Sequence, residues 1–363
     1  MSVQRGDHRL GWLGTGRMGA ELVGRLLAGG CDVSVYNRTQ AKAQPLAALG
    51  AKVVESAADL GRSDIVFATV GTSQDLLDAV LGPGGLTSAT VMPSILVDCS
   101  TISVEASAQI RAELAARGTA LLAAPLMGNP RVARAGRLTL AVSGPRAAFD
   151  TAGPYLGLLG AATYVGEDEQ ARIVKLCHNL FLGTVAQSMA EITVLAQKSG
   201  VSRQSFLACI NSSVMGSLFT RYKTPAYVNL DFTPTFTATL LRKDFDLGLA
   251  AAREHEVPLP VAALVHQIVQ GLVGRGHGDQ DFAALLEIEA DSAGLDLVSE
   301  EADVSDGLEP EGEPQAVEAL QDDGDRDDRR REDPVHEDPA RSDQVDELKH
   351  ASSSGSLFGL EPF

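Results

Sequence analysis

Three glycines near the start of the chain, Gly14, Gly16 and Gly19, constrain the fold more than any other feature. An apolar, strand-like segment (residues 10–13) runs directly into them, and a helix-like segment (residues 20–28) follows. At this spacing the first glycine permits a tight turn, the second lets a pyrophosphate approach the backbone, and the third lets the helix pack against the strand. Because the glycines lie between a strand and a helix, the motif has the context that it requires. It predicts a Rossmann domain that binds a dinucleotide.

Strand-like and helix-like segments alternate through residues 8–165, which predicts a doubly wound, mostly parallel sheet. The expected strands are 9–13, 32–36, 52–54, 65–70, 95–98, 120–123, 138–142 and 163–165. An uninterrupted stretch from Ala171 to Lys198 then predicts one long, largely buried helix that joins two domains. Further helix-like segments are 203–210, 238–255, 260–271 and 282–290. We therefore expect an α/β fold, with an N-terminal Rossmann domain (residues 1–165) followed by an all-α domain (166–294).

The last part of the chain, residues 295–363, differs in composition from the rest. It holds 22 Asp and Glu residues and six Lys and Arg residues, so it carries −16 of the formal net charge of −18. Apolar periodicity is absent there, and such a segment buries too little apolar surface to offset the entropy lost on ordering. We expect a disordered acidic tail. The preceding part is nearly neutral and has no basic stripe, so no nucleic-acid partner is expected.

Nothing in the sequence suggests export, membrane insertion or metal binding. The four cysteines, Cys31, Cys99, Cys177 and Cys209, are widely spaced, which favours buried free thiols in a reducing compartment. Residues 1–9 lack the apolar core of a signal peptide, and no apolar run is long enough to span a bilayer. We expect a cytoplasmic protein with no membrane partner and no metal site.

The end of the second expected strand indicates which dinucleotide binds. In this fold an acidic residue there binds the ribose of NAD, whereas an arginine accommodates the 2′-phosphate of NADP. Here the segment reads Asn37-Arg38-Thr39 and contains no carboxylate. Arg38 can present its guanidinium to a phosphate, and Asn37 and Thr39 can add hydrogen bonds. We therefore expect NADP as the cofactor, with NAD left open as an alternative.

Lys175 and Asn179 are the catalytic candidates. They lie one turn apart on one face of the long helix, among apolar neighbours. Desolvation lowers the pKa of a lysine toward the range of a general acid/base, and the Asn179 amide can bind the substrate or the amine. The alternative is a lysine that reaches solvent from an amphipathic helix. His178 lies close by, and we interpret it as a packing or supporting residue because the Lys–Asn pair explains the chemistry better.

Two further segments follow strands at the edge of the sheet where open α/β folds bind ligands. Residues 98–101 (Asp-Cys-Ser-Thr) place Ser100 and Thr101 to bond a nicotinamide or a substrate oxygen. Residues 124–129 (Ala-Pro-Leu-Met-Gly-Asn) offer backbone amides that can cradle a carboxylate. A helix cap is the alternative role for the hydroxyls, and both roles can coexist.

Four motifs, taken in order, resemble those of the β-hydroxyacid dehydrogenase family, which includes 3-hydroxyisobutyrate dehydrogenase, tartronate semialdehyde reductase and the glyoxylate/succinic semialdehyde reductases. They are the glycine loop with its Met18, the Asp-x-Ser-Thr segment 98–102, the helix with Lys175 and Asn179, and the segment Lys243-Asp-Phe-Asp-Leu247. The resemblance covers about residues 8–292. It implies the two-domain fold described above, usually as a homodimer or homotetramer.

The resemblance also implies roles for single residues. Lys175 would be the general acid/base, and Asn179 would orient the substrate. The cofactor-binding residues would be Gly14, Thr15, Gly16, Arg17, Met18, Gly19, Asn37, Arg38, Thr39, Val70, Gly71, Thr101 and Lys243. The substrate-binding residues would be Ser100, Met127, Gly128 and Asn129.

The chain departs from the family pattern in several places, one of which is Val132, where a glycine is usual. Gly71 stands where a proline is usual. The substrate loop reads Met127-Gly-Asn129 instead of Ser-Gly-Gly, so a hydroxyl is lost and an amide is gained. This change favours a larger or less polar carbonyl compound as an alternative substrate, with Arg131 or Arg134 as candidate anion partners.

These observations lead to three functional hypotheses. The first is an NADP-dependent oxidoreductase that transfers hydride between NADPH and the carbonyl of a small hydroxyacid or semialdehyde-like substrate, with Lys175 as general acid/base. The second is an imine reductase, although those enzymes usually carry Asp or Tyr where Lys175 stands. The third is a non-catalytic NADP-sensing protein that recruits a partner through its acidic tail. The presence of both Lys175 and Asn179 argues against the third.

Overall fold

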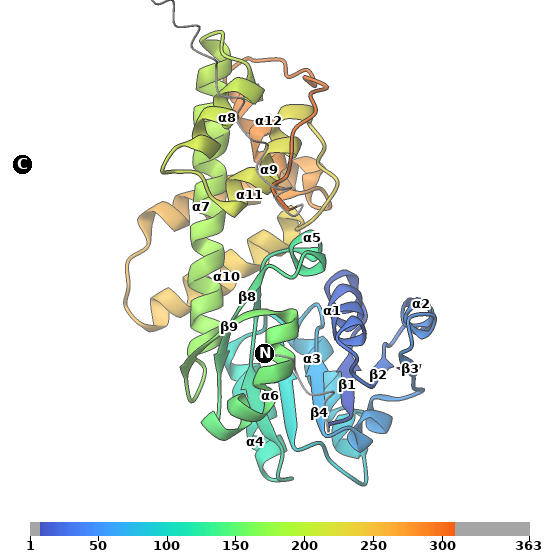
Figure 1. The fold of residues 1–363 in the computed structure, drawn as a ribbon. Coiled ribbons are helices and arrows are strands. Elements are labelled where there is room, and N and C mark those ends of the chain that lie inside the picture. Colours follow the sequence, from blue (N-terminus) through green and yellow to red (C-terminus); the bar gives the residue numbers. More distant parts are fainter. Residues whose placement is uncertain (1–7, 309–363) are drawn as a thin grey trace, which may run out of the picture. The chain divides into compact units, whose positions relative to one another are not determined.

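A computed structural model describes residues 8–308, and a nine-stranded sheet organises the first half of the chain (Figure 1). The strands are β1 (Leu10–Leu13), β2 (Val33–Tyr36), β3 (Lys52–Val53), β4 (Ile65–Ala68), β5 (Ile95–Asp98), β6 (Ala120–Ala123), β7 (Leu126–Met127), β8 (Leu138–Ser143) and β9 (Gly160–Gly166). Their order is β3-β2-β1-β4-β5-β6-β8-β7, and β9 pairs with β8. The run from β3 to β6 is parallel, whereas β8 is antiparallel to β6 and to β7.

Helices connect the strands and build the second half. Those of the first half are α1 (Arg17–Ala28), α2 (Gln44–Ala47), α3 (Ser73–Leu81), α4 (Val104–Ala115), α5 (Pro130–Arg134) and α6 (Arg146–Leu159). Those of the second half are α7 (Gln170–Lys198), α8 (Arg203–Ser212), α9 (Leu218–Asn229), α10 (Ala238–Glu254), α11 (Pro260–Leu272) and α12 (Leu285–Ser292). Short helical turns lie at Gln40–Lys42, Ala57–Arg62, Leu86–Ser88, Val273–His277 and Phe282–Ala284.

The register of the parallel strands places their carboxyl ends side by side. Leu13 of β1 pairs with Tyr36 of β2 and with Ala68 of β4, and Ala68 in turn pairs with Asp98 of β5. The loops that follow these residues therefore leave the sheet at one edge. Two apolar clusters cover the sheet. One includes α1 and α6 and lies on one face, and the other includes α3 and α4 and lies on the opposite face. The sheet is therefore buried on both sides. The predicted Rossmann fold is confirmed.

Helix α7 joins the two domains, as predicted (Figure 1). Its first turn packs Ala171 against Ala123 and Ala141 of the sheet. From Leu180 to Val194 the same helix contributes to the core of the helical domain. The helix is less buried than expected, because Phe181 and Leu195 are 70% and 67% exposed.

The predicted disordered tail begins too early. Residues 295–308 form no helix or strand, but Leu295, Leu297, Ala302 and Val304 pack against the core of the helical domain. The prediction of disorder was wrong for this segment, because its apolar side chains pack on a surface that the preceding helices form. The rest of the predicted tail, residues 309–363, lies outside the described residues.

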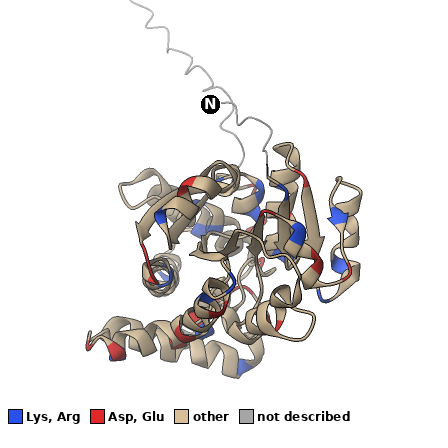
Figure 2. Cartoon of the chain, turned by 90° about the horizontal axis from the view of Figure 1, so that it is seen from below, with Lys and Arg blue, Asp and Glu red and all other residues tan. Residues whose placement is uncertain are grey.

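The prediction of buried thiols was also wrong for two of the four cysteines. All four are free, but Cys177 and Cys209 are exposed, whereas Cys99 is buried and Cys31 is partly buried. Cys177 lies on the outer face of α7, where neither domain covers it. Among residues 8–308, no helix is long and apolar enough to cross a membrane. Figure 2 shows Lys and Arg interspersed with Asp and Glu over the described helices and strands.

Candidate active site

The glycine loop after β1 has the geometry that its spacing predicts. Gly14 has φ +94°, and a Cβ there would lie 2.2 Å from the carbonyl oxygen of Thr69. A Cβ on Gly19 would lie 2.1 Å from the carbonyl oxygen of Gly14. Gly16, by contrast, faces open space. The first and third glycines are thus needed for close backbone packing, and the second leaves room for a ligand.

A cavity of about 450 Å³ opens in front of this loop. Of the expected cofactor residues, its lining includes Gly14, Gly16, Arg17, Met18, Gly19, Asn37, Arg38, Thr39, Val70 and Gly71. Helix α1 begins at the cavity with neither a side-chain cap nor an acidic residue in its first turn, so its amides can bind an anion. The buried Thr15 hydroxyl has no hydrogen-bond partner among the described residues. These features fit the pyrophosphate of a dinucleotide.

The side chains after β2 lie at the far end of this cavity. Arg38 is 80% exposed and forms an ion pair with Asp75 of α3, at 2.9 Å. Asp75 also lines the cavity, and the sequence analysis missed it because it lies 37 residues away. Asn37 is engaged within the protein: its Oδ1 accepts from the Thr15 amide and its Nδ2 donates to the Thr39 carbonyl. Asn37 therefore fixes the glycine loop, whereas Arg38 and Lys42 are cationic groups at the cavity that can contact a phosphate.

The residues after β5 connect the cofactor cavity to the helical domain. Ser100 is buried, and its Oγ accepts a hydrogen bond from the Val70 amide at 2.9 Å. The carbonyl of Thr101 accepts from Nζ of Lys243 at 3.1 Å. Ser100, Thr101 and Lys243 do not line the cofactor cavity. Arg17 does, and its guanidinium donates to the Pro234 carbonyl in the other domain.

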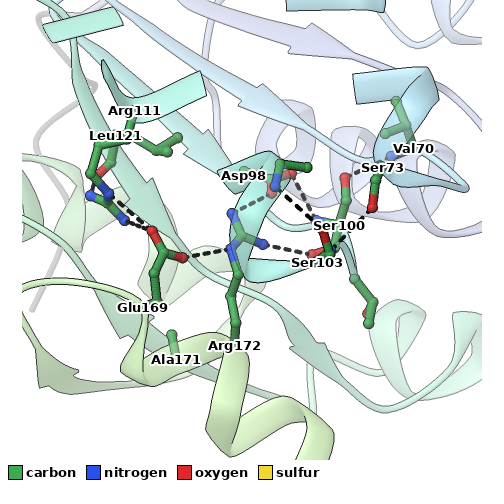
Figure 3. Close-up of polar contacts among 12 residues, drawn as sticks. Val70, Ser73, Asp98, Ser100, Ser103, Arg111, Leu121, Glu169, Ala171 and Arg172 are labelled. Atoms are coloured by element: carbon green, nitrogen blue, oxygen red, sulfur yellow. Dashed lines mark hydrogen bonds and ion pairs between the residues drawn. The ribbon is translucent and has the colours of Figure 1, made fainter. Parts of the chain in front are cut away.

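A buried network of charges fixes the start of α7 against the end of β5 (Figure 3). Arg172, on the first turn of α7, forms ion pairs with Asp98 at 2.8 Å and with Glu169 at 2.9 Å. Arg111 of α4 holds the other oxygen of Glu169 at 2.7 Å. Asp98 in turn accepts from the Ser100 amide. The sequence analysis missed Arg172, although an arginine among apolar residues in a helix expected to be buried needs partners.

Lys175 follows Arg172 by one turn and is only 8% exposed. Its Nζ donates to the Leu126 carbonyl at 2.7 Å and to Oδ1 of Asn179 at 3.1 Å. Burial lowers the pKa of Lys175 from 10.5 to about 8; Asp244 opposes this shift and Lys243 adds to it. The amine is therefore able to gain and lose a proton near neutral pH.

Asn179 links the lysine to a second pair of charges. Its Nδ2 donates to the carboxylate of Asp244 in α10, and Asp244 forms an ion pair with Lys243 at 3.2 Å. His178 also contacts Oδ1 of Asn179, and burial lowers the pKa of His178 below its usual value. The predicted pair of Lys175 and Asn179 is thus brought together, and Asp244 is the residue that orients the amide.

A second, small cavity of about 30 Å³ lies at the Lys175 amine. The predicted residues Gly128, Asn129, Lys175 and Asn179 line it together with His178. The sequence analysis missed its other walls, Leu182, Tyr222, Thr235, Phe236 and Phe282. Leu182 could have been found, because it follows Asn179 by three positions on α7, but the others come from α9, the loop before α10 and the turn Phe282–Ala284. Met127 is absent from the lining and packs against the cluster of Ala123, Ala141 and Ala171.

Comparisons with known proteins agree with this geometry. Residues 9–166 match the NAD binding domain of 6-phosphogluconate dehydrogenase, and residues 170–288 match the NAD-binding domain of NADP-dependent 3-hydroxyisobutyrate dehydrogenase. The 2-(hydroxymethyl)glutarate dehydrogenase of Eubacterium barkeri is 30% identical over 292 residues, which are 80% of this chain and 97% of that protein.

Two solved structures are also similar. A 3-hydroxyisobutyrate dehydrogenase of Mycobacterium tuberculosis, solved with L-serine, has a TM-score of 0.68 at 26% identity over 77% of this chain and 98% of its own. An imine reductase of Myxococcus stipitatus in complex with NADP+ has a TM-score of 0.51 at 25% identity over 77% of this chain and 99% of its own. The expectation of a nicotinamide dinucleotide as cofactor, NADP with NAD as an alternative, is confirmed. The chain belongs to the β-hydroxyacid dehydrogenase family of NAD(P)-dependent oxidoreductases.

Proposed function

We propose that this protein is an NADP-dependent oxidoreductase that acts on the carbonyl of a small hydroxyacid or semialdehyde-like substrate, with Lys175 as general acid/base. One observation carries the proposal: a buried amine whose pKa is lowered to about 8 lies at a cavity shared by both domains. Its hydrogen bonds to Leu126 and Asn179 hold it in place without neutralising its charge. A lysine that merely reaches solvent would be neither so buried nor so fixed.

Each residue of the site has a separate role in the proposed reaction. Bound NADPH supplies the hydride. Lys175 donates a proton to the carbonyl oxygen during reduction, and the neutral amine accepts the proton from the hydroxyl during oxidation. The Asn179 side chain, which Asp244 holds in place, orients the amine of Lys175. Its amide also offers the substrate a polar group in a fixed position. Asn129 uses its Oδ1 to cap α5, so its Nδ2 can donate to a substrate oxygen.

A preference for NADP is supported by the end of β2. Arg38 is exposed beside the cavity, with Lys42 in the same lining, and both can pair with a 2′-phosphate. The partner that Arg38 now has, Asp75, would compete with the phosphate for the guanidinium. We propose NADP as the preferred cofactor and NAD as a weaker one.

The decisive experiment replaces the lysine. Lys175→Ala is expected to lower kcat by about 10²–10⁴-fold, because general acid/base help is lost, while NADPH binding stays unchanged. Lys198→Ala, at the exposed end of the same helix, is the control and should keep full activity. Turnover and NADPH fluorescence titration measure the two effects. Wild-type turnover by Lys175→Ala would refute the role of this residue.

A substrate panel separates this function from its alternatives. It contains small aldehydes, keto acids and cyclic imines, each tested with NADPH and with NADH. The imine reductase alternative has one structural observation in its favour, the aromatic walls of Tyr222, Phe236 and Phe282. Preferential reduction of imines would favour it. No consumption of NADPH with any compound would favour the NADP-sensing alternative.

The proposal also includes the number of subunits in the protein. We propose a homodimer or homotetramer, supported by the apolar side chains of Phe181, Ile192 and Leu195 that α7 leaves exposed. Sedimentation of the purified chain measures the number of subunits. The cytoplasmic location stays a prediction.

A further inference from the structure

Residues 295–308 lie outside both regions that match the family, residues 9–166 and 170–288. They nevertheless contact both domains of the chain. In Figure 1 this orange segment runs beside α9 toward α5. We call it the strap.

The upper part of the strap is attached to the helical domain. The Glu300 carboxylate accepts hydrogen bonds from the first two amides of α8, those of Arg203 at 2.7 Å and Gln204 at 2.9 Å. The backbone of Ala302 exchanges two hydrogen bonds with the Asn229 side chain, both at 2.9 Å. These contacts tie the strap to α8 and to the end of α9.

The lower part of the strap is attached to the Rossmann domain. Asp306 forms an ion pair with Arg131 of α5 and is 7% exposed. The carbonyl of Gly307 accepts from Arg137 at 2.7 Å. Leu308 packs against the core that covers one face of the sheet. The buried side of the pair is the carboxylate, since Arg131 is 55% exposed.

Two contacts of the lower strap lie next in sequence to residues that line the small cavity at Lys175. Arg131 follows the cavity residue Asn129 by two positions, and Asn129 caps the same helix through its Oδ1, 3.0 Å from the Val132 amide. On the other side, Gly307 lies against the Arg221 side chain, next to the cavity residue Tyr222 in α9. The strap therefore joins the two walls of the cavity from outside.

We propose that the strap holds the substrate loop (residues 127–129) against α9, and that Asp306 is a positioning residue for substrate binding. This inference rests on the proposed function, because the cavity is taken as the substrate site. Asp306 also occupies the guanidinium of Arg131, so this arginine is not the anion partner that the sequence suggested. No residue of the strap lines the cofactor cavity, so we expect cofactor binding to stay unchanged when Asp306 is altered.

The test compares Asp306→Asn with Asp303→Asn, an exposed position of the same strap and the same change of charge. For Asp306→Asn we expect the substrate KM to rise about 10-fold, the order expected for loss of a charge-assisted hydrogen bond, with the Kd of NADPH unchanged. Asp303→Asn should match the wild type in both. A lower KM for carboxylate substrates in Asp306→Asn would overturn the proposal, since Arg131 would then be an anion site that Asp306 blocks. An unchanged KM would overturn it as well.

A second measurement needs no substrate. Hydrogen exchange of the α5 amides should be faster in Asp306→Asn than in Asp303→Asn or the wild type, because α5 loses its anchor. Equal exchange in all three proteins would overturn the role of the strap. If the wild type reduces no compound of the panel, the proposed function fails while this measurement still decides the strap. Arg131→Gln, which changes the exposed partner, should reproduce the effect, and the double variant should add nothing.

Discussion

At the scale of the residue, the chemistry of Lys175 comes from its surroundings. Its ammonium is buried, which disfavours the charged form, and Asp244 offsets only part of this cost through Asn179 and through space. The amine therefore titrates near pH 8, where both protonation states are populated. Burial is the main cause of the lowered pKa of Lys175, whereas Asp244 limits the shift and also orients the amide.

This titration predicts opposite pH profiles for the two directions. Reduction needs the ammonium form, so kcat/KM for the carbonyl substrate should fall as the pH rises through about 8. Oxidation needs the neutral amine, so its kcat/KM should rise over the same range. Steady-state rates from pH 6 to about 10 measure both limbs.

A pair of aspartates provides the matched comparison. Asp244→Asn removes the anion that raises the pKa of Lys175. The pH at which kcat/KM for reduction falls, the falling limb of the profile, should therefore move to a lower value. Asp246→Asn lies two residues on, where the side chain is 57% exposed, and should leave the limb in place. A limb that moved upward in Asp244→Asn would contradict the assignment of Lys175.

At the scale of the element, the junction of α7 with β5 positions Lys175. Arg172 crosses this junction and joins Asp98 to Glu169 (Figure 3). Ser100, next to Asp98, holds the Val70 amide at the cofactor cavity. One buried guanidinium thus connects the helix that carries the lysine to a loop that lines the cofactor cavity.

Removal of this guanidinium should be costly. Arg172→Met leaves Asp98 fully buried without its cation, which should lower the free energy of unfolding by about 3–5 kcal/mol. The control is Arg146→Met, which breaks an ion pair with Asp150 that is more than half exposed on both sides and should change the free energy of unfolding far less. Urea unfolding measures both. Similar losses in the two variants would contradict the role assigned to the buried network.

At the scale of the whole molecule, α7 joins two parts of the described chain, and each part has apolar packing of its own. The first half of the chain packs around the sheet, and the helical domain packs around residues such as Leu241 and Phe245. Lys243, Arg17 and the strap add contacts between the halves. We therefore expect the two cores to unfold together.

The single tryptophan makes this testable. Trp12 lies in β1, is fully buried and stacks on Phe67 of β4, so its fluorescence reports only on the Rossmann domain. Leu241→Ala, in the core of the helical domain, should cost about 2–5 kcal/mol. The Trp12 transition and the circular dichroism transition should shift together. A fluorescence midpoint that stays in place while the helical signal melts earlier would show that the domains unfold separately.

Much of the fold and of the candidate site could be predicted from local sequence patterns. The glycine spacing, the alternation of strands and helices and the apolar stretch of α7 predicted the Rossmann domain and the long helix. The pair of Lys175 and Asn179 was predictable because residues four apart share a helix face. Helix α9 was missed because Pro225 and several polar residues interrupt its pattern; a capping box of Ser217 and Thr220 and the buried side chains of the helix stabilise it.

Most helices and strands, the glycine loop and the spacing of Lys175 and Asn179 were predictable, because each depends on neighbours within a few positions. The folded chain alone shows which distant groups meet: Asp75 at Arg38, Asp98 at Arg172, Asp244 at Asn179 and Asp306 at Arg131. Each of these carboxylates lies far along the chain from its partner. Burial and charge pairing depend on where the folded chain brings such groups together, and no local pattern encodes that.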